Sequence, residues 1–179
     1  VERIERLITD YSQMLKDEAA ITSEKMQKIN LKSIVKSVVD DFNSIYNSKR
    51  GISINLKTNG SENYIILGIE NRIEQIIANL LENSISFSED NQEIHVELNQ
   101  EENGNINLNV IDQGAGFKEN DTKKIFNRFY SNRPEKFGEH SGLGLNIVKN
   151  LVDLHNGQIF AKNNKNKGAK IEIIFPKVK

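Results

Sequence analysis

The 179-residue sequence has no cysteine, which excludes a disulfide framework and a thiolate metal site. It has no apolar run near the roughly 18 residues of a membrane-spanning helix, and its first residues lack the apolar core of a signal peptide. An excess of one charge is also missing, because 24 Lys and Arg balance 25 Asp and Glu to a formal net charge of −1. These absences argue against a generic nucleic-acid or membrane-surface binder and favour a reducing, cytoplasmic setting.

The chain is long enough for one ordinary domain with an appendage. The appendage is a predicted helix over residues 1–20, whose apolar residues recur at helical spacing on one stripe. These residues are Ile4, Leu7, Ile8, Tyr11, Met14 and Leu15. No second helix of this type adjoins it, and the sequence opens on Val1, so we expect a piece of a longer protein with the stripe's partner upstream or in another copy.

The remaining sequence alternates helical and strand patterns. After a polar linker at residues 21–30, helices are predicted over 31–50, 70–87 and 142–156. Strands are predicted over 51–58, 64–67, 93–100, 105–112, 157–164 and 168–176, with a hairpin at 101–104 and a long loop at 113–141. This order predicts an α+β fold, a two-layer sandwich in which helices cover one face of a mixed sheet.

The helix at 70–87 carries two asparagines four residues apart, Asn79 and Asn83, so their amides share one face. Asparagine disfavours helix interiors because its side chain competes for the backbone. The simpler interpretation is a solvent-facing helix in an asparagine-rich chain. The functional one is an oxygen ligand for Mg²⁺ together with a phosphate contact, because Mg²⁺ prefers hard oxygen donors and takes most of them from phosphate and water.

Two glycine motifs flank the long loop. Asp112 follows a predicted strand and precedes Gly114 and Gly116, which suits a base-recognising carboxylate beside closely approaching backbone but is also ordinary turn composition. Gly142 and Gly144 precede an apolar helix, whose first amides form a ready anion site. A lone Gly-x-Gly also serves helix-start packing, and this spacing is neither a Walker loop nor a Rossmann fingerprint.

In their joint order, these motifs resemble the four boxes of sensor histidine kinases. ANLLENSISFS at 78–88 is similar to the N box, DQGAGF at 112–117 to the G1 box, KKIFNRFYS at 123–131 to the F box and SGLGL at 141–145 to the G2 box. RIERLITDYSQMLK resembles the second helix of the family's dimerisation and histidine-phosphotransfer domain. The resemblance implies a Bergerat ATP-binding fold preceded by one long helix. It divides the chain into that helix and its linker at 1–29 and a catalytic ATP-binding domain at 30–179, with a lid at about 113–141.

The resemblance also implies the nucleotide contacts. Asn83 is expected to ligate Mg²⁺ and Asn79 to assist at the phosphates, which makes these two the catalytic candidates. Asp112 is expected to accept a hydrogen bond from the adenine amino group, with Gly114 and Gly116 shaping the pocket floor.

The other two boxes are implied to serve the triphosphate and the lid. Gly142, Leu143 and Gly144 are expected to place backbone amides at the triphosphate of ATP. Phe126 and Phe129 are expected to anchor the lid to a neighbouring helical domain, although aromatics at this spacing more often form local core.

Two departures from the family pattern stand out. The family often has Lys three residues after the Mg²⁺ ligand, where this chain has Ser86; Arg128, Arg133 and Lys136 are candidates to replace it or are simply solvated. None of the histidines lies in the family's phosphoacceptor context, so that group is expected on another helix. They are His95, His140 and His155.

The implied function is transfer of the γ-phosphoryl group of Mg-ATP to that histidine, for relay to a response-regulator aspartate. Related ATPases carry a general-base Glu where this chain has Asn79, and an amide cannot take a proton at neutral pH. The expected partners are the upstream phosphoacceptor helix, a response regulator and a second copy of the full protein, with no nucleic acid and no membrane contact by this piece. We expect a cytoplasmic domain of an inner-membrane sensor. The alternatives are an ATPase of the same superfamily and a partner-binding module that has lost nucleotide affinity.

Overall fold

The computed structural model describes Ser12, residues 24–59, 63–118, 122–128 and 143–165, Tyr130, and residues 167–178. Ser12 is helical; the rest of the helix predicted at 1–20 lies outside the described residues. Gly142, Phe129, His140, Arg133 and Lys136 lie outside them as well.

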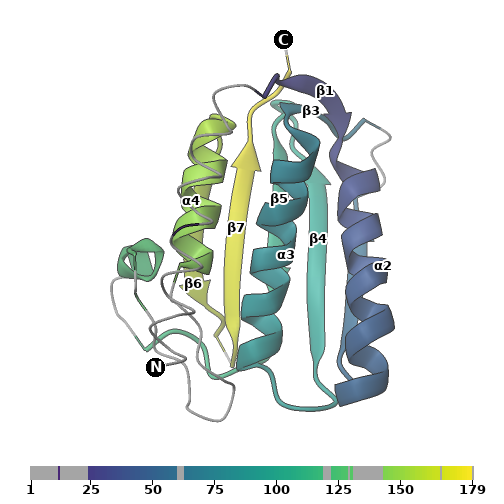
Figure 1. Cartoon of the computed structure of the whole chain (residues 1–179), viewed down its shortest axis with the longest axis vertical. Coiled ribbons are helices and arrows are strands. Elements are labelled where there is room, and N and C mark those ends of the chain that lie inside the picture. Colours follow the sequence, from purple (N-terminus) through teal and green to yellow (C-terminus); the bar gives the residue numbers. More distant parts are fainter. Residues whose placement is uncertain are drawn as a thin grey trace.

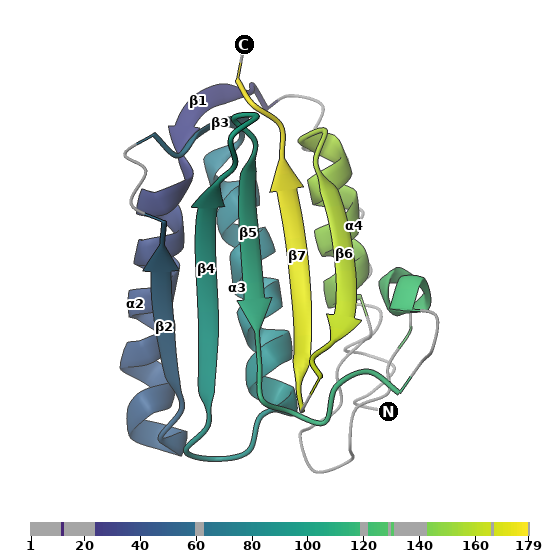
Figure 2. The same ribbon diagram turned by 180° about the vertical axis from the view of Figure 1, so that it is seen from behind.

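A five-stranded mixed sheet with strand order β2-β4-β5-β7-β6 forms one layer (Figure 2). Strands β2 and β4 are parallel, and every other neighbouring pair is antiparallel. A separate two-stranded sheet pairs β1 with β3. The strands are β1 Gln27–Asn30, β2 Ser53–Thr58, β3 Ile65–Gly68, β4 Glu93–Gln100, β5 Ile106–Ile111, β6 Gln158–Asn163 and β7 Ala169–Phe175.

Three α-helices lie side by side on one face of this sheet (Figures 1 and 2). They are α2 Leu31–Arg50, α3 Glu70–Phe87 and α4 Gly144–Leu154. Alternate residues of the strands face the helices, as Ile94, Val96 and Leu98 of β4 do at 0% exposure. The core is therefore one apolar layer between helices and sheet, and the predicted α+β sandwich is confirmed.

The C-terminal ends of α2 and α3 both lie at the lower edge of the molecule in Figure 1. Gly51 ends α2 in a left-handed conformation with φ of 64°, and its amide donates to the Asn47 carbonyl at 2.9 Å. The neighbouring Arg50 guanidinium reaches α3, where it donates to the carbonyls of Ile85 at 2.9 Å and Ser88 at 2.7 Å. It thereby gives a charged donor to carbonyls at the end of α3, where, among the described residues, the Ile85 carbonyl otherwise receives only the Ser88 amide at 3.3 Å.

The structure adds two elements to the sequence prediction. The polar linker predicted at 21–30 contains β1, whose residues pair with β3. The loop predicted at 113–141 contains a short 3₁₀ helix, η1, at Thr122–Phe126. The strand β1 is short and mostly exposed, which is why its sequence lacks the alternation that marks a half-buried strand.

Candidate nucleotide-binding site

Asp112 directly follows the end of β5, the central strand of the five-stranded sheet. Its side chain is 5% exposed, and Oδ1 accepts from the backbone amides of Gly114 at 2.9 Å and Ala169 at 3.1 Å. Among the described residues, Oδ2 receives no hydrogen bond. Burial raises the pKa of Asp112, and the two amide donors oppose that rise. Asp112 therefore presents one fixed, partly desolvated acceptor at the end of the sheet.

The loop after Asp112 is shaped by two glycines, as the sequence suggested. A Cβ on Gly114 would lie 2.5 Å from the carbonyl oxygen of Phe87, the last residue of α3, so only glycine lets the loop touch that helix. Gly116 has a φ of +78°, and a Cβ at this position would collide with the side-chain amide of Asn163. The Asn163 side chain pairs with both backbone groups of Phe117, accepting from N at 2.6 Å and donating to O at 2.8 Å.

Two residues of this site escape the sequence patterns, Asn163 and Gly168. Gly168 has a φ of +95°, and a Cβ there would overlap the Asp112 carbonyl, so it lets β7 begin directly against Asp112. The sequence places Gly168 just before the last strand, a position that predicts only an ordinary turn glycine and not a contact with Asp112. Asn163 carries no signal, because its partner Phe117 is 46 residues away in sequence.

The two asparagines of α3 lie on the helix that packs beside α4 (Figure 1). Asn79 is half-buried and points towards the first turn of α4, because a Cβ on Gly144 would lie 4.0 Å from its Oδ1. Asn83 is 9% exposed, one turn nearer the end of α3 that touches the Gly114 loop. Glu82 is exposed, as expected from its rotation around the helix.

The first turn of α4 offers backbone amides in the same region. Leu143, the residue at its N-cap, makes no side-chain cap hydrogen bond, so among the described residues no side chain competes with an external acceptor for the leading amides. Leu143 precedes it with a side chain only 1% exposed, which fixes the backbone where the helix begins. Phe126 is 9% exposed and belongs to the chain's own hydrophobic core, which favours the local-core interpretation over an anchor for a neighbouring domain.

The residues present fit ATP and Mg²⁺. The Asp112 carboxylate suits an amino-bearing base, and uncapped helix amides beside a glycine suit phosphate. The described residues contain no group of three or more His, Cys, Asp or Glu that could hold a metal ion. A Mg²⁺ ion here would therefore take most of its ligands from the nucleotide and water, with an amide oxygen such as that of Asn83 as the protein donor.

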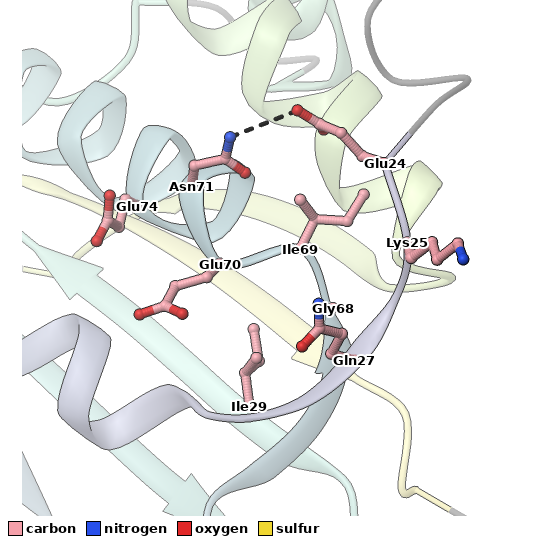
Figure 3. Close-up of a pocket in the computed structure, with 9 residues that line it drawn as sticks. All are labelled: Glu24, Lys25, Gln27, Ile29, Gly68, Ile69, Glu70, Asn71 and Glu74. Carbon is pink, nitrogen blue, oxygen red and sulfur yellow. Dashed lines mark hydrogen bonds between the residues drawn. The ribbon is translucent and has the colours of Figure 1, made fainter.

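A pocket of ≈ 450 Å³ lies at the opposite end of the sheet, between residues 24–29 and the first turn of α3 (Figure 3). Three glutamates line it, Glu24, Glu70 and Glu74, against one lysine, Lys25. Glu24 forms a bidentate ion pair with Arg72, at 2.9 and 3.1 Å, and Arg72 lowers the pKa of Glu24. An acidic pocket repels a triphosphate, which favours the Asp112 end over this pocket as the candidate nucleotide site.

A comparison with protein-family models matches residues 68–179 to the histidine kinase-, DNA gyrase B- and HSP90-like ATPases. The match contains α3, the Asp112 loop and α4, and thus every element of the site. The chain belongs to this ATPase family. Within the described residues, no helix of this family member is long and apolar enough to cross a membrane.

Curated relatives of this ATPase-family chain are sensor kinases, which confirms the resemblance seen in the motifs. It is 34% identical to the sensor protein ChvG of Agrobacterium fabrum over 91% of its length, and 35% identical to ChvG of Rhizobium meliloti over 96%. The sensor histidine kinase YvrG of Bacillus subtilis is 33% identical over 98%. The chain spans about a third of these relatives, covering 28%, 31% and 30% of their lengths.

Solved structures agree with the fold. The catalytic domain of histidine kinase ThkA superposes with a TM-score of 0.74 at 25% identity, covering 86% of this chain and 96% of that one. ThkA in complex with the response regulator TrrA superposes with a TM-score of 0.76 at 23% identity, covering 99% of this chain and 49% of that chain.

Proposed function

We propose that this chain binds Mg-ATP and delivers its γ-phosphoryl group to a histidine on the dimerisation helix of the full-length protein. The observation that carries the proposal is the meeting of Asn79 with Gly144, at the same end of the fold as the buried Asp112 carboxylate. This end combines a base-recognising acceptor, amide oxygens and uncapped helix amides, the groups that a purine nucleoside triphosphate requires.

In the proposed mechanism, the chain's own residues bind and orient the nucleotide. Asp112 Oδ2 accepts from the adenine amino group while Oδ1 remains occupied by the amides of Gly114 and Ala169. Backbone amides at Gly142, Leu143 and Gly144 hold phosphate oxygens, and Asn79 supports them from α3. Asn83 would hold Mg²⁺, which would supply charge neutralisation at the phosphates.

Phosphoryl transfer is favoured over hydrolysis because Asn79 stands in α3 where the related ATPases carry a general-base Glu. A neutral amide orients groups but cannot remove a proton from water, so an incoming imidazole is the better nucleophile. A bond from the imidazole nitrogen to the γ-phosphorus forms, the bond to the β,γ-bridging oxygen breaks, and ADP leaves. The imidazole ring proton is lost to solvent.

The domain division and the partners belong to the same proposal. Residues 1–29 are the end of a dimerisation helix and its linker, and residues 30–179 form the catalytic domain with its lid at about 113–141. The full-length protein is a homodimeric sensor of the inner membrane, and this part of it lies in the cytoplasm. A response regulator receives the phosphoryl group on aspartate, consistent with the partner that ThkA has in its complex.

Autophosphorylation of the full-length protein tests this function. With γ-labelled ATP and Mg²⁺, label is expected on a histidine, recognised by its acid lability, and Asn83→Ala should abolish the labelling. The matched control is Asn150→Ala, which removes an exposed asparagine of α4. Sustained phosphate release by this chain without any histidine domain would instead support the ATPase, and an absence of nucleotide binding would support the partner-binding module.

A further inference from the structure

One side-chain hydrogen bond joins the two ends of the segment that runs from η1 to α4. The Asn146 amide nitrogen Nδ2 donates to the carbonyl oxygen of Phe126 at 2.9 Å, in a partly buried position. Phe126 is the last residue of η1, and Asn146 stands in the first turn of α4. Residues 127–145 separate them in sequence, so this bond joins two elements that are not adjacent along the chain.

The η1 end of this connection is fixed to the body of the domain. Thr122 donates from Oγ1 to the Ala161 carbonyl of β6 at 2.7 Å. The side chains of Ile125 and Phe126 are buried at 2% and 9% exposure. Because η1 is held by the sheet and the core, the bond from Asn146 connects the first turn of α4 to a fixed part of the domain.

The turn of α4 that carries Asn146 also carries Gly144. Two residues along a helix correspond to about 200° of rotation, so Gly144 faces Asn79 of α3 while Asn146 faces η1 on nearly the opposite side. The bond from Asn146 to η1 therefore fixes the position, relative to the core, of the side of the turn that carries Gly144.

We propose that Asn146 is a positioning residue that sets the first turn of α4 for phosphate binding by tying it to η1. This inference rests on the proposed nucleotide function. A turn already held in its binding position loses less conformational freedom when it binds a ligand. Asn146 acts through the backbone of α4 and contacts no substrate itself.

The position requires a donor. Phe126 offers a carbonyl oxygen, which only a donor can bond. Among the described residues the buried Asn146 Oδ1 has no hydrogen-bond partner, so the hydrogen bond that this side chain makes there is the one from Nδ2. Asn146→Asp keeps the shape and places a second acceptor against the Phe126 carbonyl. Asn146→Ala removes the group outright.

The first test measures Mg-ATP affinity of the chain by calorimetric titration, together with its thermal midpoint. Loss of one hydrogen bond predicts roughly a three- to ten-fold weaker affinity for Asn146→Ala, with a larger effect for Asn146→Asp. The melting temperature of Asn146→Ala should stay close to wild type, and phosphotransfer by the full-length variant at saturating ATP should also be preserved. Asn150→Ala, an exposed asparagine on the same helix, should match wild type throughout.

The second test needs no nucleotide. Hydrogen exchange of the Asn127 amide, which donates to the Lys124 carbonyl at 3.1 Å, reports on the η1 end. Asn146→Ala should accelerate this exchange severalfold in the free chain, and Asn150→Ala should not. If the wild-type chain binds no Mg-ATP, the proposed nucleotide function is wrong. Hydrogen exchange then still tests whether Asn146 holds α4 and η1 together. Unchanged exchange, unchanged affinity, or an affinity loss matched by a general loss of stability in both Asn146 variants would overturn the proposal.

Discussion

At the scale of single residues, Asp112 shows how one carboxylate serves both structure and binding. Oδ1 joins the end of β5 to the start of β7 through the Ala169 amide and orders the loop through Gly114. Oδ2 is left for a ligand. Because burial raises the folded-state pKa, the folded protein holds the Asp112 proton more tightly than the unfolded chain does. Ionisation of Asp112 therefore costs stability, and this cost grows as the pH rises above 3.8, the ordinary pKa of an aspartate, towards the raised folded-state pKa.

The variant Asp112→Asn separates these two roles. Its amide oxygen preserves the acceptor for Gly114 and Ala169, while its NH₂ group places a donor against the adenine amino group. We expect the free energy of unfolding at pH 7 to be equal to or higher than that of wild type. Mg-ATP affinity should fall roughly 10- to 100-fold, the range of an unsatisfied hydrogen bond to a charged partner. Urea unfolding and calorimetry measure both quantities, and retained affinity would refute the adenine assignment.

At the scale of elements, the last turn of α3 depends on a side chain from α2. Arg50 donates to the carbonyls of Ile85 and Ser88 and to the carboxylate of Asp90 at 2.8 Å, with its side chain 22% exposed. This turn supports Phe87, whose carbonyl contacts Gly114 of the site. The element that carries Asn83 is thus held at its end from outside the site.

Replacing Arg50 by methionine keeps much of the aliphatic stem and removes the donors. We expect a loss of about 1 to 3 kcal/mol in the free energy of unfolding, because carbonyls at the end of α3 lose a charged partner. Mg-ATP binding should weaken as well, since the Gly114 loop rests on that turn. Denaturant unfolding checks the first effect. Lys49→Met, at an exposed neighbouring position, is the control, and equal stability of both variants would contradict the capping role.

Much of this arrangement follows from local sequence patterns. The bounds of α2, α3 and β4 agree with prediction to the residue, because each has strong periodicity and α2 ends at a glycine. The parallel pairing of β2 with β4, the strand β1, and the roles of Asn163 and Gly168 are not encoded locally. They arise where distant segments meet, as when Asn163 pairs with the Phe117 backbone or Gly168 admits Asp112.

At the scale of the whole molecule, His155 ties the end of α4 to the start of α3. Its Nδ1 donates to the Leu151 carbonyl at 2.7 Å and its Nε2 accepts from the Ile69 amide at 3.1 Å, which assigns the neutral Nδ1–H tautomer. It also meets the Phe175 ring edge-on, at 6.5 Å between centroids. The ring is 2% exposed, and burial lowers its pKa.

This junction predicts a pH-dependent stability. Because the folded-state pKa lies below the ordinary 6.5, the unfolded chain protonates first as the pH falls. The contribution of His155 to the free energy of unfolding is complete above pH 6.5. Below that pH it is lost, by up to about 1.4 kcal/mol per pH unit. Urea unfolding at pH 7.5 and 5.5 should show this fall in wild type and a smaller one in His155→Ala. His95→Gln controls for removal of a histidine from the open sheet face, and equal slopes in wild type and His155→Ala would contradict the prediction.

The most direct test of the central claim is a titration of the chain with a fluorescent ATP analogue, with and without Mg²⁺. The account predicts saturable binding that Mg²⁺ strengthens and that excess unlabelled ATP displaces. An absence of saturable binding in the presence of Mg²⁺ would contradict it.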